Sequence, residues 1–244
     1  VDPDKMEDYR KGIEPAVITN HNKVANHYKV PTINLAKEVT ERIDNGEFTW
    51  KDDFINLHPS PFGQGVYANS MIQLLDDAYS GHIDADDKIT SQIMPAKLDP
   101  NCYDNGTLID ISTIKLSKGW SVDQAWNPND GTGSRANYIN VPMLISEKPG
   151  STISTNFKGN VVGIAVAAGK DAGMIEYRID KGAWKKQDLF TKWSKSLHLP
   201  WYYTLATGLS NEEHKLEIRL SGERNEQSSG NACRIRYVYI NGEE

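Results

Sequence analysis

The chain has 244 residues, of which 38% are apolar and 25% charged, a composition typical of a globular protein with a proper core. Its net charge is −6, and Lys and Arg are scattered, which argues against a nucleic-acid partner. No apolar run approaches the ~20 residues of a membrane span. The chain starts Val1-Asp-Pro-Asp-Lys-Met, with neither an initiator Met nor a signal peptide, so we expect a truncated or processed chain.

The first eighty residues have a helical pattern with one short apolar segment. A helix should end near Tyr28, and Val30–Leu35 should form a buried strand. Val39 and Ile43 then recur at helical spacing until Gly46 stops the element. Helix, strand and helix in this order predict the end of a doubly wound α/β domain.

A further helix should begin at Pro61, with Ser60 as its N-cap and Pro61 in the favoured first position. Its apolar residues make one stripe, which predicts a buried face. The stripe consists of Tyr67, Met71, Leu74, Leu75 and Ala78.

Residues 81–110 are polar and lack periodicity, so we expect a connector on the surface. His82 and the acidic residues of Asp84–Asp87 within it lack the Gly and distal Glu of an EF-hand loop, and a solvated turn is the favoured interpretation. Asn127–Gly133 is a loop that could hold calcium, although a plain loop is again favoured. His21 and His27 are six residues apart, too far round a helix for a metal pair.

Residues 111–244 turn to short strands separated by Gly- and Pro-containing turns. Several segments alternate apolar and polar residues, which is typical of half-buried strands. This pattern predicts an all-β antiparallel sandwich, jelly-roll-like in character. The predicted strands are Tyr138–Ser146, Thr152–Phe157, Val161–Ala168, Met174–Asp180, Tyr202–Ala206, Lys215–Leu220 and Arg234–Ile240.

One motif carries chemistry: Leu57-His58-Pro59-Ser60-Pro61-Phe62-Gly63, where a short apolar segment ends in His-Pro and a capped helix follows. This places the His58 imidazole at a sheet edge beside a helix N-terminus, where pockets in open α/β folds form. Histidine suits proton transfer near neutral pH, and it activates a Ser hydroxyl by taking its proton.

The His-Pro-x-x-x-Gly block after Val-Pro-Thr-Ile-Asn-Leu resembles the last block of SGNH/GDSL-type hydrolases, in a carbohydrate-esterase-like subgroup that often carries a C-terminal sandwich. The resemblance covers roughly residues 8–80. It implies a flavodoxin-like α/β/α fold, a Ser nucleophile, His58 as the catalytic base and no cofactor or metal. It also implies a secreted or periplasmic bacterial protein that removes O-acyl groups from glycans.

The sequence departs from that family in two ways. Where the family has Asp three residues before the His, this chain has Ile55, and the nearest acids are Asp52 and Asp53. Asp53 could orient the imidazole if the loop bulges, a main-chain carbonyl could do so, or the enzyme could work as a Ser–His dyad. Neither Gly-Asp-Ser nor Gly-x-Ser-x-Gly occurs, so the nucleophile and the oxyanion donors are missing from these residues.

Cys102 and Cys233 fit no metal-ligand spacing, and we favour two unpaired thiols over a disulfide. Exposed aromatic side chains could stack on sugar rings, although packing in the sandwich is the favoured role for most of them. The aromatic candidates are Trp184, Trp193, Trp201, Tyr202 and Tyr203.

Three alternatives to a self-contained esterase stay open. The sandwich could be a non-catalytic carbohydrate-binding module with an α/β remnant. It could dock a protein partner through an apolar patch. Or a missing N-terminal fragment could complete the α/β domain around His58, in which case apolar helix faces should be exposed.

Overall fold

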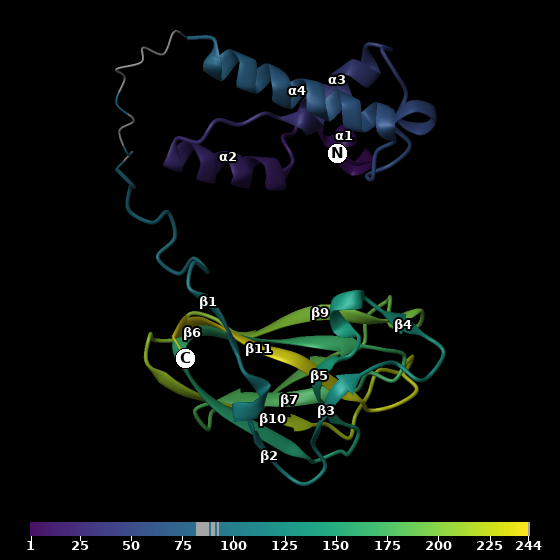
Figure 1. Ribbon diagram of the computed structural model, residues 1–244, viewed down its shortest axis with the longest axis vertical. Helices are drawn as coiled ribbons and strands as arrows, with labels where there is room; N and C mark the ends of the chain where they lie inside the picture. Colours follow the sequence, from purple (N-terminus) through teal and green to yellow (C-terminus); the bar gives the residue numbers. More distant parts are fainter. Residues whose placement is uncertain (82–87, 89–90, 92, 244) are drawn as a thin grey trace. The chain divides into compact units, whose positions relative to one another are not determined.

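The computed structural model describes all residues except 82–87, 89, 90, 92 and 244. Contacts divide the chain into a helical unit, Val1–Pro100, and a β unit, Asn101–Glu244 (Figure 1). The helical unit contains α1 (Pro3–Arg10), α2 (Ala16–Tyr28), α3 (Leu35–Asp44), the π-helical turn η1 (Trp50–Phe54) and α4 (Pro61–Tyr79). The β unit contains β1 (Gly106–Ile109), η2 (Ile111–Thr113), β2 (Lys115–Leu116), β3 (Ser121–Trp126), β4 (Gly133–Ser134), η3 (Ala136–Tyr138), β5 (Val141–Ser146), β6 (Thr152–Ala168), β7 (Met174–Ile179), β8 (Lys185–Asp188), β9 (Leu197–Ala206), β10 (Glu213–Leu220) and β11 (Cys233–Glu243).

The described residues of the helical unit form no strand, so the flavodoxin-like α/β/α arrangement is not seen there, and the strand predicted at Val30–Leu35 was wrong. This segment instead contains the C-terminal end of α2 and the N-cap of α3. Lys29 adopts a left-handed conformation (φ 54°), and Val30 N donates to Ala25 O at 2.8 Å, which closes α2. At the other end, the Asn34 side chain accepts from the main chain of α3 and caps that helix.

The core of the helical unit is a small, largely aromatic cluster. Its buried members are Val39, Phe48, Phe54 and Val66. The Phe54 ring stacks on Trp50 with centroids 5.3 Å apart and meets Tyr67 edge-on at 5.4 Å.

Much apolar surface of this unit stays exposed. The predicted helix at Pro61 is confirmed, but its stripe is only partly covered, because Met71 and Leu75 are 48% and 54% exposed. The other exposed large apolar residues of residues 1–81 are Ile13, Val17, Val24, Val30, Ile55, Leu57, Phe62, Ile72 and Tyr79.

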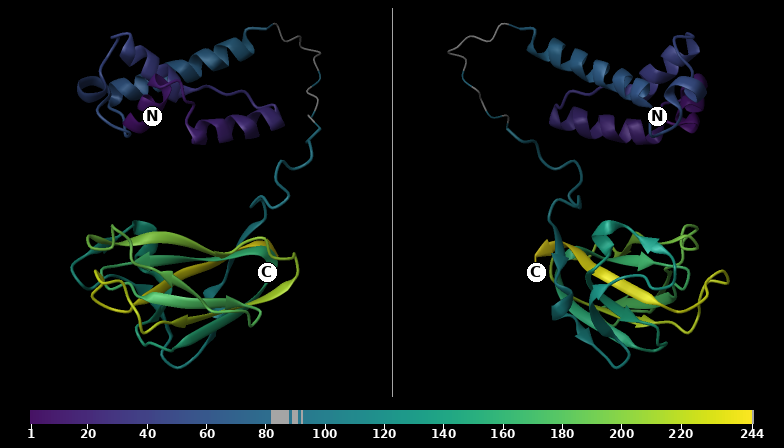
Figure 2. Two further views of the ribbon diagram at one scale, coloured as in Figure 1. Left: turned by 180° about the vertical axis from the view of Figure 1, so that it is seen from behind. Right: turned by 45° about the vertical axis from the view of Figure 1, so that its right-hand side comes forward.

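The β unit is a curled, antiparallel arrangement organised around the long strand β6 (Figures 1 and 2). The first half of β6 pairs with β10, whereas its second half lies between β11 and β9. The two predicted strands Thr152–Phe157 and Val161–Ala168 are therefore one strand. It carries Gly159 at φ 153°, where a Cβ would come within 2.3 Å of the Asn241 carbonyl oxygen.

One large apolar core lies inside the curl, so the predicted sandwich-like character is supported. The alternation in β10 is confirmed, since Leu216, Ile218 and Leu220 all point into this core. Sequence periodicity did not reveal β1, β2, β4 or β8, which have two to four residues each, or β3, in which only Trp126 is buried. β4 pairs with β9 in parallel.

Both cysteines are free, as predicted, and burial raises the pKa of the Cys233 thiol to about 12. Within the described residues, no helix is long and apolar enough to cross a lipid bilayer.

Candidate active site around His58

His58 lies in a short loop, residues 55–60, that joins η1 to α4. One acceptor closes this loop: the Phe54 carbonyl oxygen accepts from Asn56 N at 3.1 Å and from Ser60 N at 3.0 Å. Because the Phe54 side chain is completely buried, the loop is anchored to the core of the helical unit.

The loop begins with a strained turn. Ile55 has φ 79° and ψ −60°, and with the hydrogen bond from Asn56 N to Phe54 O this is a γ-turn with positive φ. A β-branched residue rarely adopts this conformation, which costs about 1–3 kcal/mol, and such strain concentrates at functional sites. Asn56 Oδ1 then accepts from His58 N at 2.7 Å, which fixes the backbone that carries the imidazole.

The end of the loop is held equally firmly. Ser60 Oγ accepts from Gly63 N at 3.2 Å and donates to Asp53 O at 2.5 Å, so the predicted N-cap is confirmed. A Cβ on Gly63 would lie 2.7 Å from Pro59 Cβ and 2.8 Å from the Phe54 ring. The glycine therefore lets α4 pack against the loop that displays His58.

The imidazole of His58 is exposed, and its neighbours Ile55 and Leu57 are 53% and 61% exposed. Among the described residues, none forms a hydrogen bond with the His58 ring. The Ser60 hydroxyl is used by the helix cap, so no candidate nucleophile meets His58 in this part of the chain.

Asp53, predicted as the orienting acid, lies in a different set of contacts. Its Oδ2 accepts from Thr49 N at 2.7 Å and from Thr49 Oγ1 at 3.0 Å. Thr49 Oγ1 in turn accepts from Asp52 N at 3.1 Å. This is a capping arrangement at the start of η1, and within the described residues no hydrogen bond joins Asp53 to His58.

The β unit contains a Ser–His–Asp set that sequence reasoning missed. His214 Nδ1 lies 2.6 Å from Asp180 Oδ2, and Nε2 lies 2.9 Å from Ser210 O and 3.3 Å from Ser210 Oγ. Burial alone lowers the His214 pKa, but the bonds to Asp180 and Ser210 outweigh it and raise that pKa. The Ser210 carbonyl oxygen can only accept, so Nε2 donates to it and is not placed to accept the Ser210 hydroxyl proton. The set therefore ties two turns together.

A second histidine of the β unit, on strand β9, contacts the loop considered for calcium. His198 is 2% exposed, and its Nε2 lies 3.1 Å from Asp130 Oδ2. Asp130 also accepts from Thr132 Oγ1 at 2.6 Å and pairs with Lys170 at 3.4 Å. With its carboxylate so occupied, Asp130 does not present a cation site. No group of three or more His, Cys, Asp or Glu in the described residues is placed to hold a metal ion.

The aromatic candidates do not form one row. The guanidinium groups of Arg178 and Arg219 both lie over the Trp184 ring, with Cζ atoms 4.5 and 4.2 Å from the ring centres. Tyr203 points inward and donates to a main-chain carbonyl at 3.0 Å. The exposed members are Trp193 (49%), Trp201 (42%) and Tyr202 (62%).

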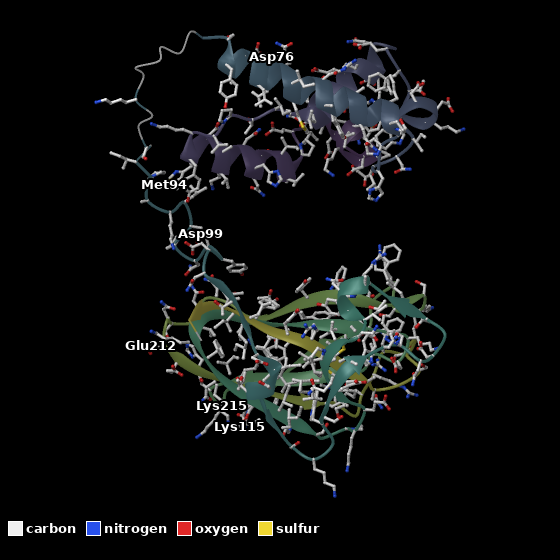
Figure 3. All side chains as sticks on the ribbon, in the orientation of Figure 1. Asp76, Met94, Asp99, Lys115, Glu212 and Lys215 are labelled. Carbon is white, nitrogen blue, oxygen red and sulfur yellow. The ribbon has the colours of Figure 1, made fainter. Side chains whose placement is uncertain are left out.

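A polar hollow of about 260 Å³ lies beside the lysines of β2 and β10, Lys115 and Lys215 (Figure 3). Lys215 forms an ion pair with Glu217 at 3.4 Å. We interpret the hollow as part of an ordinary solvated surface of the β unit.

No family model matches the sequence, and no curated protein matches it. Among solved structures, the chain is similar to a two-domain esterase (CEX) active on acetylated mannans. It is 20% identical to one crystal structure, covering 92% of this chain and 59% of that one, with a TM-score of 0.69. A second crystal structure, obtained with mannopentaose, is 18% identical with the same TM-score, covering 92% of this chain and 58% of that one. At this identity the likeness establishes the fold, and the chain spans less than two thirds of these structures.

Proposed function

We propose that this chain is the histidine-bearing part of a serine ester hydrolase that removes O-acyl groups from glycans. The observation that carries the proposal is the His58 loop, anchored by Phe54 at both ends and strained at Ile55. A surface histidine without a catalytic role needs neither feature. The fold shared with a two-domain esterase supports the same conclusion.

In the proposed reaction a serine from outside residues 1–244 attacks the acyl carbon, while His58 takes the hydroxyl proton. His58 then returns that proton to the departing sugar oxygen. Water, deprotonated by His58, next attacks the acyl-enzyme, which releases the carboxylic acid and restores the serine. Asp53 acts as a positioning residue: its bonds to Thr49 shape η1, and η1 leads directly into the His58 loop.

The serine-bearing partner is proposed to be a further α/β segment that packs on the exposed apolar residues of the helical unit. Leu57 and Phe62, on either side of His58, are 61% and 49% exposed. An apolar surface bordering a histidine offers both burial and exclusion of water, which strengthen electrostatic interactions in an active site. The extra length of the similar esterases is compatible with such a segment.

For the substrate we propose acetylated glycans, with acetylated mannan first, because the similar esterase acts on acetylated mannans. Such polymers do not enter cells intact, and we therefore expect a secreted or periplasmic location.

The test uses the native protein, characterised by intact mass and N-terminal sequencing. Hydrolysis of p-nitrophenyl acetate and of acetylated manno- and xylo-oligosaccharides is compared for wild type, His58→Ala and the control His21→Ala. We expect His58→Ala to lower kcat/KM by about 10²–10⁴-fold and His21→Ala to leave it unchanged. Equal activity of all three proteins, or no hydrolysis by the native protein, contradicts the proposal.

The alternative is a non-catalytic carbohydrate-binding module. It is favoured by the exposed Tyr202 on the β unit. Glycan binding by a native protein that hydrolyses none of these esters would establish it.

A further inference from the structure

A hollow of about 410 Å³ lies between two sheet edges of the β unit. Its walls come from the hairpin of β7 and β8 on one side and from residues 204–207 and 209, at and after the end of β9, on the other (Figure 1). β8 is the last strand in the sheet order, and β9 pairs with β6 and with the two-residue strand β4. The volume of the hollow is that of a site for a small molecule.

The Tyr177 side chain forms part of the wall and carries a hydroxyl group without a partner. Tyr177 is 9% exposed, and its ring packs in the large apolar core. No described residue forms a hydrogen bond with its hydroxyl, and this oxygen, unlike that of Tyr138, is not sealed in the interior. Burial raises the pKa of Tyr177, so the hydroxyl stays protonated at neutral pH and can donate. Polar groups of buried residues are normally hydrogen-bonded, and here the hollow is the place for an acceptor.

Lys185 brings a positive charge to the same hollow. It lies directly opposite Tyr177 in the register of β7 and β8, and residues directly opposite each other lie on the same face of a sheet. Within the described part of the chain, no carboxylate forms an ion pair with the Lys185 ammonium group. The other cation of the lining, Arg178, donates from its Nε to Glu217 at 2.8 Å. The described residues that line the hollow include no Asp or Glu, so Lys185 gives it a net positive charge.

We propose that this hollow binds the carboxylate group of a small organic acid, with Lys185 forming the ion pair and Tyr177 donating a hydrogen bond. Hydrogen bonds to an ionised acceptor are about twice as strong as neutral ones. The wall also contains Ile179, Leu205 and Leu209, which can contact the carbon skeleton of the acid. An inorganic anion would leave these apolar contacts unused, and a neutral sugar would leave the Lys185 charge unpaired. This binding does not depend on the proposed hydrolysis.

The test is an NMR titration of the isotope-labelled full chain with sodium acetate, butyrate and glucuronate. Acetate and butyrate represent free carboxylic acids, whereas glucuronate represents a carboxylate carried by a sugar, and glucose is the neutral control. The amide signals of residues 177–185 and 204–207 report on the hollow. We expect at least one carboxylate to shift them saturably, with a Kd of about 1 mM or below, and neither glucose nor sodium chloride at equal ionic strength to do so.

Two variants and one control identify the groups that bind. Lys185→Gln removes the charge and should weaken binding by about 10-fold or more. The control Lys186→Gln should bind like wild type, because Lys186 is the next residue of β8, lies on the opposite face and pairs with Glu223. Tyr177→Phe removes only the hydroxyl. It should weaken binding by about 3–10-fold while the Tm stays equal or rises, a combination that a merely structural role does not produce.

Wild-type affinity in Lys185→Gln or in Tyr177→Phe overturns the inference, as does a wild-type chain whose signals respond to no carboxylate. Equal shifts with sodium chloride also overturn it, since the lysine then attracts anions without selecting a carboxylate. Hydrolysis by the native protein is measured separately, so the failure of either proposal leaves the other in place.

Discussion

Two glycines on α4, two residues apart, should respond in opposite directions to the same added methyl group. At Gly63 a Cβ would lie 2.7 Å from Pro59 and 2.8 Å from the Phe54 ring, whereas at Gly65 nothing lies within 4 Å. Both residues are inside α4, and both gain the helix propensity of alanine. The pair therefore isolates the packing between α4 and the His58 loop.

The expected magnitudes follow from these distances. Gly65→Ala should stabilise the helical unit by about 0.5–1 kcal/mol. Gly63→Ala gains the same helix propensity, but its methyl group overpacks the contact with Pro59 and the buried Phe54 ring, which costs about 1–3 kcal/mol. It should be neutral to destabilising by about 2 kcal/mol, so the two variants differ by about 1–3 kcal/mol.

Urea unfolding followed by circular dichroism at 222 nm measures this difference, because the α-helices lie in the helical unit. Esterase activity of the native protein should fall in Gly63→Ala and persist in Gly65→Ala. Equal shifts of the same sign in both variants would refute the role assigned to Gly63.

Four further predictions concern stability. Burial and the charge of Arg234 lower the pKa of His198 in the folded state. Below about pH 6.5 the unfolded histidine binds a proton more readily than the folded one, so the Tm of the β unit should fall as the pH drops. The variant His198→Gln should show a smaller fall of the Tm. The pKa of His214 is raised in the folded state, so His214 stabilises the β unit below about pH 6.5 and this stabilisation is lost as the pH rises through the folded pKa. The variant His214→Gln should therefore change the slope of Tm against pH in the direction opposite to His198→Gln. Asn241 accepts from Asn105 N at 3.0 Å and donates to Asn160 Oδ1 at 2.8 Å, so Asn241→Ala should lower the free energy of unfolding by about 1–3 kcal/mol in urea titration. Ile55→Gly should relieve the γ-turn and raise the thermal stability of the helical unit or leave it unchanged, whereas a clear loss would show that the turn is unstrained.

The features that sequence predicts well here depend on short-range physics. Ser60 and Pro61 mark the start of α4 because the cap and the first helical turn involve neighbours only. The alternation in β10 likewise identifies its core residues. Val30–Leu35 reads as a strand by composition, but a strand needs a partner, and the described residues of the helical unit offer none.

As for the fold, the parts of the candidate site that depend on neighbouring residues could be predicted from the sequence. The position of His58 in a loop before a capped helix follows from local pattern. The capping contact of Thr49 was harder to find, because it is made by Asp53, four residues on, and not by Asp52 at the usual three-residue spacing. The contact between Tyr202 and Tyr239 could not be read from the sequence. Their ring centres come within 6.1 Å of each other only through the register of β9 and β11 on β6. Register between distant strands is decided by long-range packing.

The exposed stripe of α4 and the exposed His58 have one explanation under the proposed function. Met71 and Leu75 are exposed one helical turn apart on one face of α4. Phe62 is exposed as well, but nine residues at about 100° each place it on the opposite side of the helix from Met71, next to the His58 loop. One packed element would therefore cover Met71 and Leu75, and a second would cover Phe62. A nucleophile carried by the second would meet His58, which fits a histidine displayed on a rigid loop without a partner in the described residues.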